Sequence, residues 1–122
     1  MKEILRQHHI SFKNALSGVK YAFFTQPNFR VHLFLSTLAV IGAKILSISN
    51  TEMIIIIFTI VLGIAGEMIN TAIESVTDLV TTEWRKEAKI SKDVSAGMML
   101  CISIGAFAIA CVIFLPYIFD LI

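Results

Sequence analysis

Three long apolar segments decide what this chain can fold into. They cover about residues 31–48, 53–80 and 94–118. A membrane span needs roughly 20 residues at about 1.5 Å rise each, and all three segments reach that length once their lightly polar ends are included. The composition agrees, because 57% of the residues are hydrophobic and only 16% are charged, whereas about a quarter of a soluble domain is charged. The sequence therefore predicts an all-α membrane protein with three transmembrane helices.

A soluble all-α protein is the alternative for so apolar a chain, since buried core helices can be apolar all round. Three such helices need a large polar surface to cover them, and a chain of 122 residues has too little. No cleavable signal peptide is expected, because residues 1–30 carry charges and no apolar stretch that ends in a small-residue cleavage site. One membrane domain covering residues 1–122 is the favoured organisation.

The basic residues set the expected orientation in the membrane. All Lys and Arg except Lys44 lie before the first span or between the second and third, and the positive-inside rule places both regions in the cytoplasm. We therefore expect a multi-pass protein of the cell membrane with a cytoplasmic N-terminus. Lys44 lies near the outer end of its span, where its side chain can reach the interface. A net charge of +1 gives no indication of a nucleic-acid partner.

An amphipathic surface helix is expected ahead of the first span, at about residues 8–24. Apolar residues recur there at helical spacing, while the opposite face carries lysines and other polar residues. Such a helix typically lies in the membrane surface and needs no catalytic role. Pro27 in "TQPN" then ends the helix and turns the chain into the first span. The apolar face consists of Phe12, Ala15, Leu16, Val19, Ala22 and Phe23.

Small residues recur in the third span, where Gly97, Cys101 and Gly105 stand at four-residue spacing. Small residues at this spacing let two helices approach closely. The pattern therefore predicts a tight helix–helix contact on that face. Cys101 and Cys111 have no metal-binding spacing, so we expect them to be packed thiols.

The second span carries a polar stripe directly after its apolar start. At 100° per residue, Glu67, Asn70, Glu74 and Asp78 fall within about 80° of one another. A continuous helix over 53–80 is about 42 Å long, longer than a hydrocarbon core of about 30 Å, so its polar half reaches the cytoplasmic boundary. Acids inside a bilayer are costly and are functional candidates by default. Asp78 has a simpler explanation, since it is expected in the headgroup zone.

Two chemical tasks fit this stripe. Acidic groups with an Asn on one face can hold a hard cation such as Mg²⁺, and a deeper carboxylate can act as general base toward a lipid hydroxyl. Glu67 and Glu74 are seven residues apart, about 10 Å along the axis, so they suit two adjacent tasks. Lys92 and Asp93 are expected immediately before the third helix, where free N–H groups and the helix dipole favour a phosphate. Asp93 is equally suited to cap that helix.

The pattern E-x-x-N-T-A-I-E-x-x-x-D at 67–78, followed by "KISKDVSAG" at 89–97, resembles the prokaryotic diacylglycerol kinase family, which includes the undecaprenol kinases. "NFRVHL" at 28–33 and "SFKNALSGVKYAF" at 11–23 also resemble it, so the likeness covers nearly the whole chain. It implies a lipid kinase of the bacterial cell membrane. The enzyme would be a homotrimer with active sites between protomers, taking ATP and Mg²⁺ from the water and a lipid alcohol from the membrane. "NFRVHL" favours undecaprenol as the acceptor, with diacylglycerol as the second candidate.

The resemblance also implies roles for individual residues. Glu67 would be the base that takes the proton from the lipid hydroxyl, with Asn70 beside it. Glu74 would bind the Mg²⁺ of the nucleotide, while Lys92 and Asp93 would position its phosphates. The residues implied around ATP are Asn14, Gln26, Glu74, Glu83, Arg85, Lys92 and Asp93.

Two positions depart from the family pattern. Gln26 stands where the family usually has a second metal-binding glutamate, and Arg85 where it often has a histidine. A glutamine carbonyl can bind Mg²⁺ but adds no negative charge, so we expect weaker metal binding. Two alternatives to an active kinase follow. One is a catalytically impaired family member that acts as a membrane assembly partner, and the other is a small ion or proton conductor whose acidic stripe lines a path.

Overall fold

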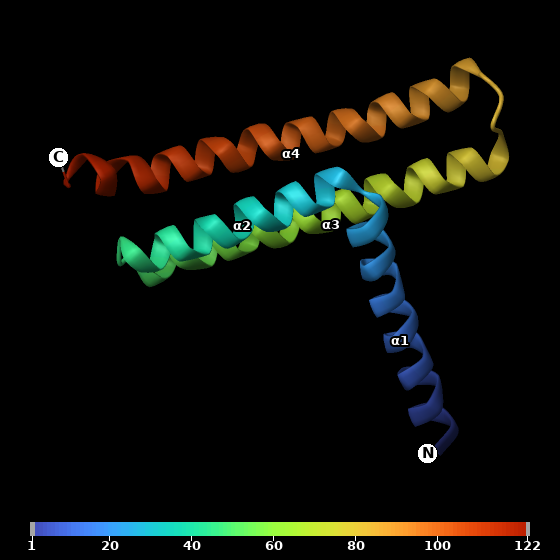
Figure 1. The fold of residues 1–122 in the computed structure, drawn as a ribbon, viewed down its shortest axis with the longest axis horizontal. Helices are drawn as coiled ribbons and strands as arrows, with labels where there is room; N and C mark the ends of the chain where they lie inside the picture. The colour runs from blue at the N-terminus through green and yellow to red at the C-terminus, as the bar shows by residue number, and fades with distance from the viewer. Residues whose placement is uncertain (1, 122) are drawn as a thin grey trace.

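In the computed structural model, which describes residues 2–121 and their side chains from residue 11 onward, the chain forms four α-helices (Figure 1). Helix α1 covers Lys2–Thr25, α2 covers Pro27–Ile45, α3 covers Asn50–Val80 and α4 covers Lys86–Phe119. This described part contains no strand. The predicted all-α fold is therefore confirmed.

Helices α2, α3 and α4 lie side by side, and α1 leaves them at a steep angle (Figure 1). Helix α3 is the central one, because it packs against both α2 and α4. A short connection at 46–49 joins α2 to an antiparallel α3, and another at 81–85 joins α3 to an antiparallel α4. Since α2 begins part-way along α3, the last part of α3 and the first part of α4 project beyond it (Figure 1).

Two helices in the described part of the chain, α3 and α4, are long and apolar enough to cross a membrane. Helix α2 has 19 residues, about 28 Å of helix, and it contains Arg30, His32 and Lys44. Most large apolar side chains of α3 and α4 are exposed in the single chain, as lipid-facing side chains are. By length and composition, α3 and α4 are thus candidate membrane spans.

The helix boundaries differ from the predicted ones. Helix α1 starts at Lys2, six residues before the predicted start, and α2 stops at Ile45, three residues before the predicted end. The largest difference is at α4, which starts at Lys86 and not near residue 94. Its first two turns are rich in Lys, Glu and Ala, which favour a helix in water. The apolar run that begins near residue 94 marks where a membrane would begin. Helix α4 starts before that point, outside the apolar run.

A tight turn joins α2 to α3. Ser47 adopts a left-handed conformation with φ of 52°. Ser49 and Glu52 then form a capping box, in which each side chain accepts a hydrogen bond from the other residue's backbone N–H. The hydroxyl of Tyr117 on α4 donates to the same Glu52 carboxylate at 2.7 Å. One glutamate thus both starts α3 and joins it to the end of α4.

Helix α3 packs closely against α4 at Gly66. A Cβ atom there would lie 2.6 Å from the Ile102 Cδ1 and 3.1 Å from the Met99 sulfur. The tight contact predicted for Gly97 and Gly105 is absent within the described chain, since nothing lies within 4 Å of a Cβ at either position. At 100° per residue, both glycines lie on a different side of α4 from Met99. The glycine that allows close packing is therefore on α3.

Gly66→Leu is expected to lower the free energy of unfolding by about 1–3 kcal/mol, because an added side chain overpacks the contact with α4. Thermal unfolding of the purified protein in one detergent measures this. Ala65→Leu is the matched control, since it adds a large side chain at the neighbouring position of α3, which is exposed. If Gly66→Leu unfolded at the parental temperature, the close α3–α4 contact would be refuted.

Candidate functional site

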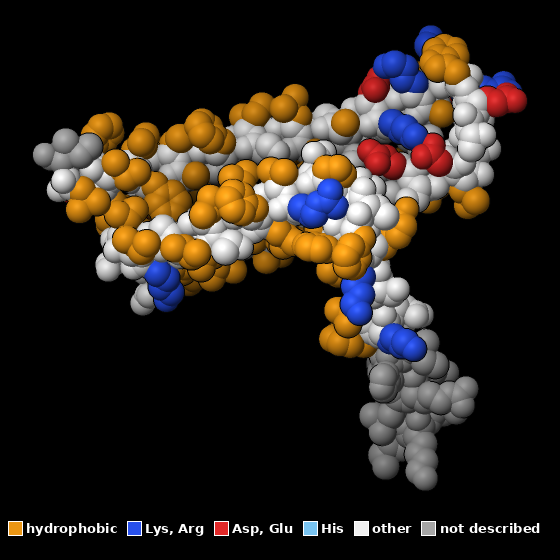
Figure 2. Space-filling view, viewed as in Figure 1, with side chains coloured by type: hydrophobic (Ala, Val, Ile, Leu, Met, Phe, Trp, Pro, Cys, Tyr) orange, Lys and Arg blue, Asp and Glu red, His pale blue; other side chains and the backbone are white. Residues whose placement is uncertain are grey.

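The predicted polar stripe lies on the face of α3 that meets α4, and it becomes more exposed along the helix. Glu67 is 2% exposed and Asn70 is 7% exposed. Glu74 is half-buried, and the side chain of Asp78 is 57% exposed. Figure 2 shows charged side chains gathered at the end where the loop joins α3 to α4. The stripe therefore leads from the interior of the helix bundle to its charged end.

Glu67 is the most deeply buried member of the stripe. Its Oε2 atom is buried and has no hydrogen-bond partner among the described residues. Leaving a buried carboxylate oxygen unpaired costs free energy. Such an atom is therefore a candidate to meet a ligand.

A chain of hydrogen bonds connects α4 to Glu74. The hydroxyl of Ser95 donates to Asn70 Oδ1 at 2.6 Å, and the side-chain nitrogen of Asn70 donates to Glu74 Oε1 at 3.1 Å. Ser95 is 3% exposed. Ser95 was not among the predicted site residues, although it stands in "KISKDVSAG", three residues after Lys92. At that spacing it shares one helix face with Lys92.

The prediction that Lys92 and Asp93 stand immediately before a helix is wrong. Helix α4 begins after Arg85, its N-cap residue, so Lys92 lies well inside the helix, beyond the free N–H groups of the first turn. For the same reason Asp93 is not the cap. Lys92 contacts Asp78 on α3 at 2.6 Å, and Asp93 pairs with Lys89 one turn earlier.

These contacts place Lys92 close to Glu74. Asn70 and Asp78 lie one turn before and one turn after Glu74 on α3, and their partners on α4 are Ser95 and Lys92. The ammonium of Lys92 and the carboxylate of Glu74 therefore lie about one turn apart along the α3–α4 contact. This arrangement offers a negative group for a metal ion beside a positive group for phosphate.

Other predicted nucleotide residues lie away from this contact. Arg85 and Glu83 form an exposed ion pair at 3.1 Å in the loop between α3 and α4. Asn14 is exposed on α1, the helix that leaves the bundle (Figure 1). A single chain thus brings Glu83 and Arg85 together, and it leaves Asn14 on a separate element.

Gln26 lies at the junction of α1 and α2. It is the N-cap residue of α2, and its side chain makes no capping hydrogen bond. His32 packs against Gly63 on α3, and α2 and α3 run in opposite directions. Gln26 lies six residues before His32 on the α2 side, so it is level with the residue six positions after Gly63 on α3. This puts Gln26 near the level of Ile69, less than two turns short of Glu74.

The oxygen atoms of this region suit Mg²⁺. Among the described residues, no three His, Cys, Asp or Glu side chains lie close enough to hold a metal ion by themselves. Mg²⁺ usually takes one or two protein carboxylates and completes its shell with waters and substrate phosphates. Glu74 fits this use, because Asn70 engages one carboxylate oxygen and the other remains for a ligand.

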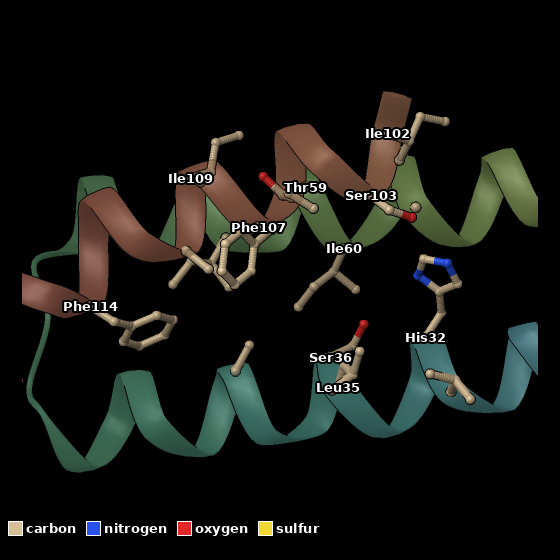
Figure 3. Close-up of a pocket in the computed structure, with 16 residues that line it drawn as sticks. His32, Leu35, Ser36, Thr59, Ile60, Ile102, Ser103, Phe107, Ile109 and Phe114 are labelled. Carbon is tan, nitrogen blue, oxygen red and sulfur yellow. The ribbon is translucent and has the colours of Figure 1, made fainter. Parts of the chain in front are cut away.

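An apolar groove of about 410 Å³ opens between α2, α3 and α4 (Figure 3). His32 lies at one end of it and Phe114 at the other. Gly63, one turn before Glu67, forms part of the wall, so the buried carboxylate lies next to the end marked by His32. The sequence had indicated His32 only as part of "NFRVHL". The lining suits a hydrocarbon chain whose polar end faces Glu67.

Comparison with known proteins decides the family. Residues 13–114 match the family described as prokaryotic diacylglycerol kinase. The chain belongs to this family. A diacylglycerol kinase of Synechocystis is 38% identical over 108 residues, which cover 88% of this chain and 62% of that protein. An undecaprenol kinase of Bacillus subtilis is 32% identical over 106 residues, which cover 87% of this chain and 86% of that protein.

A diacylglycerol kinase of Haemophilus influenzae is 33% identical over 95 residues, 75% of this chain and 80% of that protein. The chain thus spans less than two thirds of the Synechocystis relative and most of the other two. The predicted family is confirmed, and the chain is a member of a family of membrane lipid kinases. The relatives' names include both predicted acceptors.

Proposed function

We propose that this chain is a multi-pass kinase of the bacterial cell membrane that phosphorylates a lipid alcohol with ATP. The observation that carries the proposal is the buried Oε2 atom of Glu67, which has no partner within the described structure and lies beside an apolar groove. The polar stripe leads from it to Glu74 and Lys92, so a lipid hydroxyl and an aqueous nucleotide can meet there. Undecaprenol and diacylglycerol are the two acceptor candidates, because relatives carry both names.

In the proposed reaction, Glu67 accepts the proton of the lipid hydroxyl while that oxygen attacks the γ-phosphorus of ATP. The bond between the γ-phosphorus and the bridging oxygen breaks, and ADP leaves. Lys92 supplies positive charge toward the phosphates, and Asn70 holds Glu74 in place. When bound at Glu74, Mg²⁺ would neutralise phosphate charge. Transfer of this kind depends on positioning and charge neutralisation more than on covalent catalysis.

The remaining predicted residues are assigned to the nucleotide. Glu83 and Arg85 would contact the nucleotide from the loop between α3 and α4, since both side chains are exposed at the charged end of the molecule. Asp93 would act together with its partner Lys89, and Gln26 would offer a neutral oxygen ligand to the metal. Asn14 would reach the nucleotide from a surface helix, since it is exposed on α1.

We also propose a homotrimer with sites completed between protomers, in line with the family resemblance. Two features support this assembly. Helix α1 with Asn14 extends away from its own bundle (Figure 1), where it is available to a neighbouring protomer. The face of α4 with Gly97 and Gly105 is open in the single chain, and small residues allow another helix to approach closely.

The proposed topology has α2, α3 and α4 spanning the membrane and α1 in its cytoplasmic surface. About 28 Å of helix lets α2 cross a hydrocarbon core of about 30 Å. Helix α1 keeps Phe12 and Leu16 exposed and buries Ala22, as expected for a helix that rests on lipid. The charged end of α3 and α4 (Figure 2) then lies in the cytoplasm with the N-terminus.

The decisive experiment supplies purified protein in lipid with γ-labelled ATP, Mg²⁺ and either undecaprenol or diacylglycerol. Phosphorylated lipid is separated and counted. We expect transfer to at least one of the two alcohols, at a rate that depends on Mg²⁺ concentration. The better acceptor identifies the substrate class.

The same assay separates the rival functions. Gln26 replaces a glutamate that the family usually has, which suggests a catalytically impaired assembly partner. Such a protein would label neither lipid at any Mg²⁺ concentration. An ion conductor would also label neither lipid, and it would carry current across liposomes without ATP. Either result would refute the proposed kinase activity.

A further inference from the structure

Ser95 is a buried hydroxyl with one specific partner. It is 3% exposed, and it donates to Asn70 Oδ1 over 2.6 Å between two different helices. The carboxylate of Glu74 only accepts hydrogen bonds when ionised, so the Asn70 group that faces it is the NH₂. The Asn70 carbonyl then faces α4, where a hydroxyl donor is needed. Ser95 supplies that donor and fixes the orientation of the amide.

The orientation of Asn70 in turn controls Glu74. A glutamate side chain has several rotatable bonds, and a hydrogen bond at 3.1 Å holds its Oε1. The second carboxylate oxygen is thereby directed to one position. Partners that orient a metal-binding carboxylate typically change metal affinity or activity by about 10–100-fold when removed. The effect is important here because Gln26 brings no second charged ligand.

We propose that Ser95 is a positioning residue of the metal–nucleotide site, acting through Asn70 on Glu74. The inference rests on the proposed function in one respect, that Glu74 binds the metal ion of the nucleotide. Ser95 itself touches neither the metal nor the phosphates. It holds the Asn70 amide so that Glu74 keeps one carboxylate oxygen turned to the ion.

Ser91 provides a matched control one turn earlier on α4. Its hydroxyl lies 3.5 Å from the Thr77 hydroxyl, at the limit of a hydrogen bond, and the residue is exposed. Removing it deletes one hydroxyl from the same helix and the same contact with α3. It leaves the Ser95–Asn70–Glu74 chain intact.

The test compares Ser95→Ala, Ser95→Thr and Ser91→Ala in the full-length protein. Two quantities are measured: the Mg²⁺ concentration for half-maximal lipid phosphorylation, and the binding of Mn²⁺ with ADP, followed by the electron paramagnetic resonance of free Mn²⁺. Ser95→Ala is expected to raise the half-maximal Mg²⁺ concentration and weaken Mn²⁺ binding by about 10–100-fold. At saturating Mg²⁺ its kcat stays near the parental value. Ser95→Thr keeps the hydroxyl and restores metal binding, and Ser91→Ala behaves as the parent.

Parental metal dependence and Mn²⁺ binding in a folded Ser95→Ala variant would overturn the inference. If Ser95→Ala does not fold, Ser95→Cys replaces it, because a thiol fills the site but donates only weakly. The same metal defect is then expected, and parental binding overturns the inference. A parent protein that binds Mn²⁺ with ADP in a Ser95-dependent way but phosphorylates neither lipid would refute the proposed function and support the role of Ser95.

Discussion

Glu67→Gln is expected to lower kcat for lipid phosphorylation by about 10²–10⁴-fold, the contribution typical of a general base. Glutamine has nearly the same shape and fits the same buried position, but it does not accept the hydroxyl proton. The variant should still bind Mn²⁺ with ADP, because Glu74 and Lys92 are unchanged. The measurement is the steady-state rate at saturating lipid, ATP and Mg²⁺.

The stability of the same variant is the second half of this test. The parent buries a carboxylate oxygen that has no partner in the described structure, and burying a neutral amide costs less than burying a charge. Glu67→Gln is therefore expected to unfold at the parental temperature or above it. Asp120→Asn removes a carboxylate from the exposed C-terminal end and serves as the control for charge loss. A Glu67→Gln variant with parental kcat would remove Glu67 from the proposed mechanism.

Helical periodicity was sufficient to predict the face that carries the candidate site. The spacing of Glu67, Asn70, Glu74 and Asp78 depends only on 100° per residue, and an unbroken α3 realises it. The burial order along the stripe also follows from its position after an apolar run. Local pattern thus predicted both the stripe and its deep end.

Contacts between helices were not predictable in the same way. Ser95 reaches Asn70 over 25 residues of sequence, and no local pattern indicates which hydroxyl of α4 faces α3. The close approach at Gly66 depends on where Ile102 and Met99 lie. The spacing of small residues predicted close packing at Gly97, yet α4 packs against α3 with the face that carries Met99 and Ile102. Such pairings depend on the rotation of each helix about its axis, which one sequence does not specify.

The start of α4 shows a different limit. Asp93 before an apolar run satisfies the rules for a helix start, but the preceding residues also favour a helix, and the structure continues the helix back to Lys86. The consequence is chemical, because Lys92 acts as a side-chain cation beside Glu74 and not as part of a helix N-terminus. Recognition of phosphate by Lys92 is then expected to depend on its contact with Asp78.

Glu74→Gln is expected to raise the Mg²⁺ concentration for half-maximal activity by about 100-fold, equivalent to about 2.7 kcal/mol of binding free energy. A neutral amide replaces the carboxylate that we propose as the ligand of this hard divalent ion. Gln26→Glu is expected to act in the opposite direction, lowering that concentration by about tenfold, or about 1.4 kcal/mol. Mg²⁺ titration of the lipid phosphorylation rate measures both effects.

The double variant, Gln26→Glu with Glu74→Gln, tests whether residues 26 and 74 bind the same metal ion. Residues that share one ligand give non-additive effects, whereas independent residues add. If both bind one Mg²⁺, Gln26→Glu replaces the lost metal-binding carboxylate in the Glu74→Gln background, so its benefit there exceeds tenfold and returns the metal dependence toward the parental value. If Gln26→Glu lowers the half-maximal Mg²⁺ concentration tenfold in both backgrounds, residue 26 does not bind the ion directly. Its added negative charge would then attract the ion from a distance. No benefit in either background would show that Gln26, although near the level of Ile69, does not reach the metal ion. Glu74 would then be the one of these two residues that binds the ion.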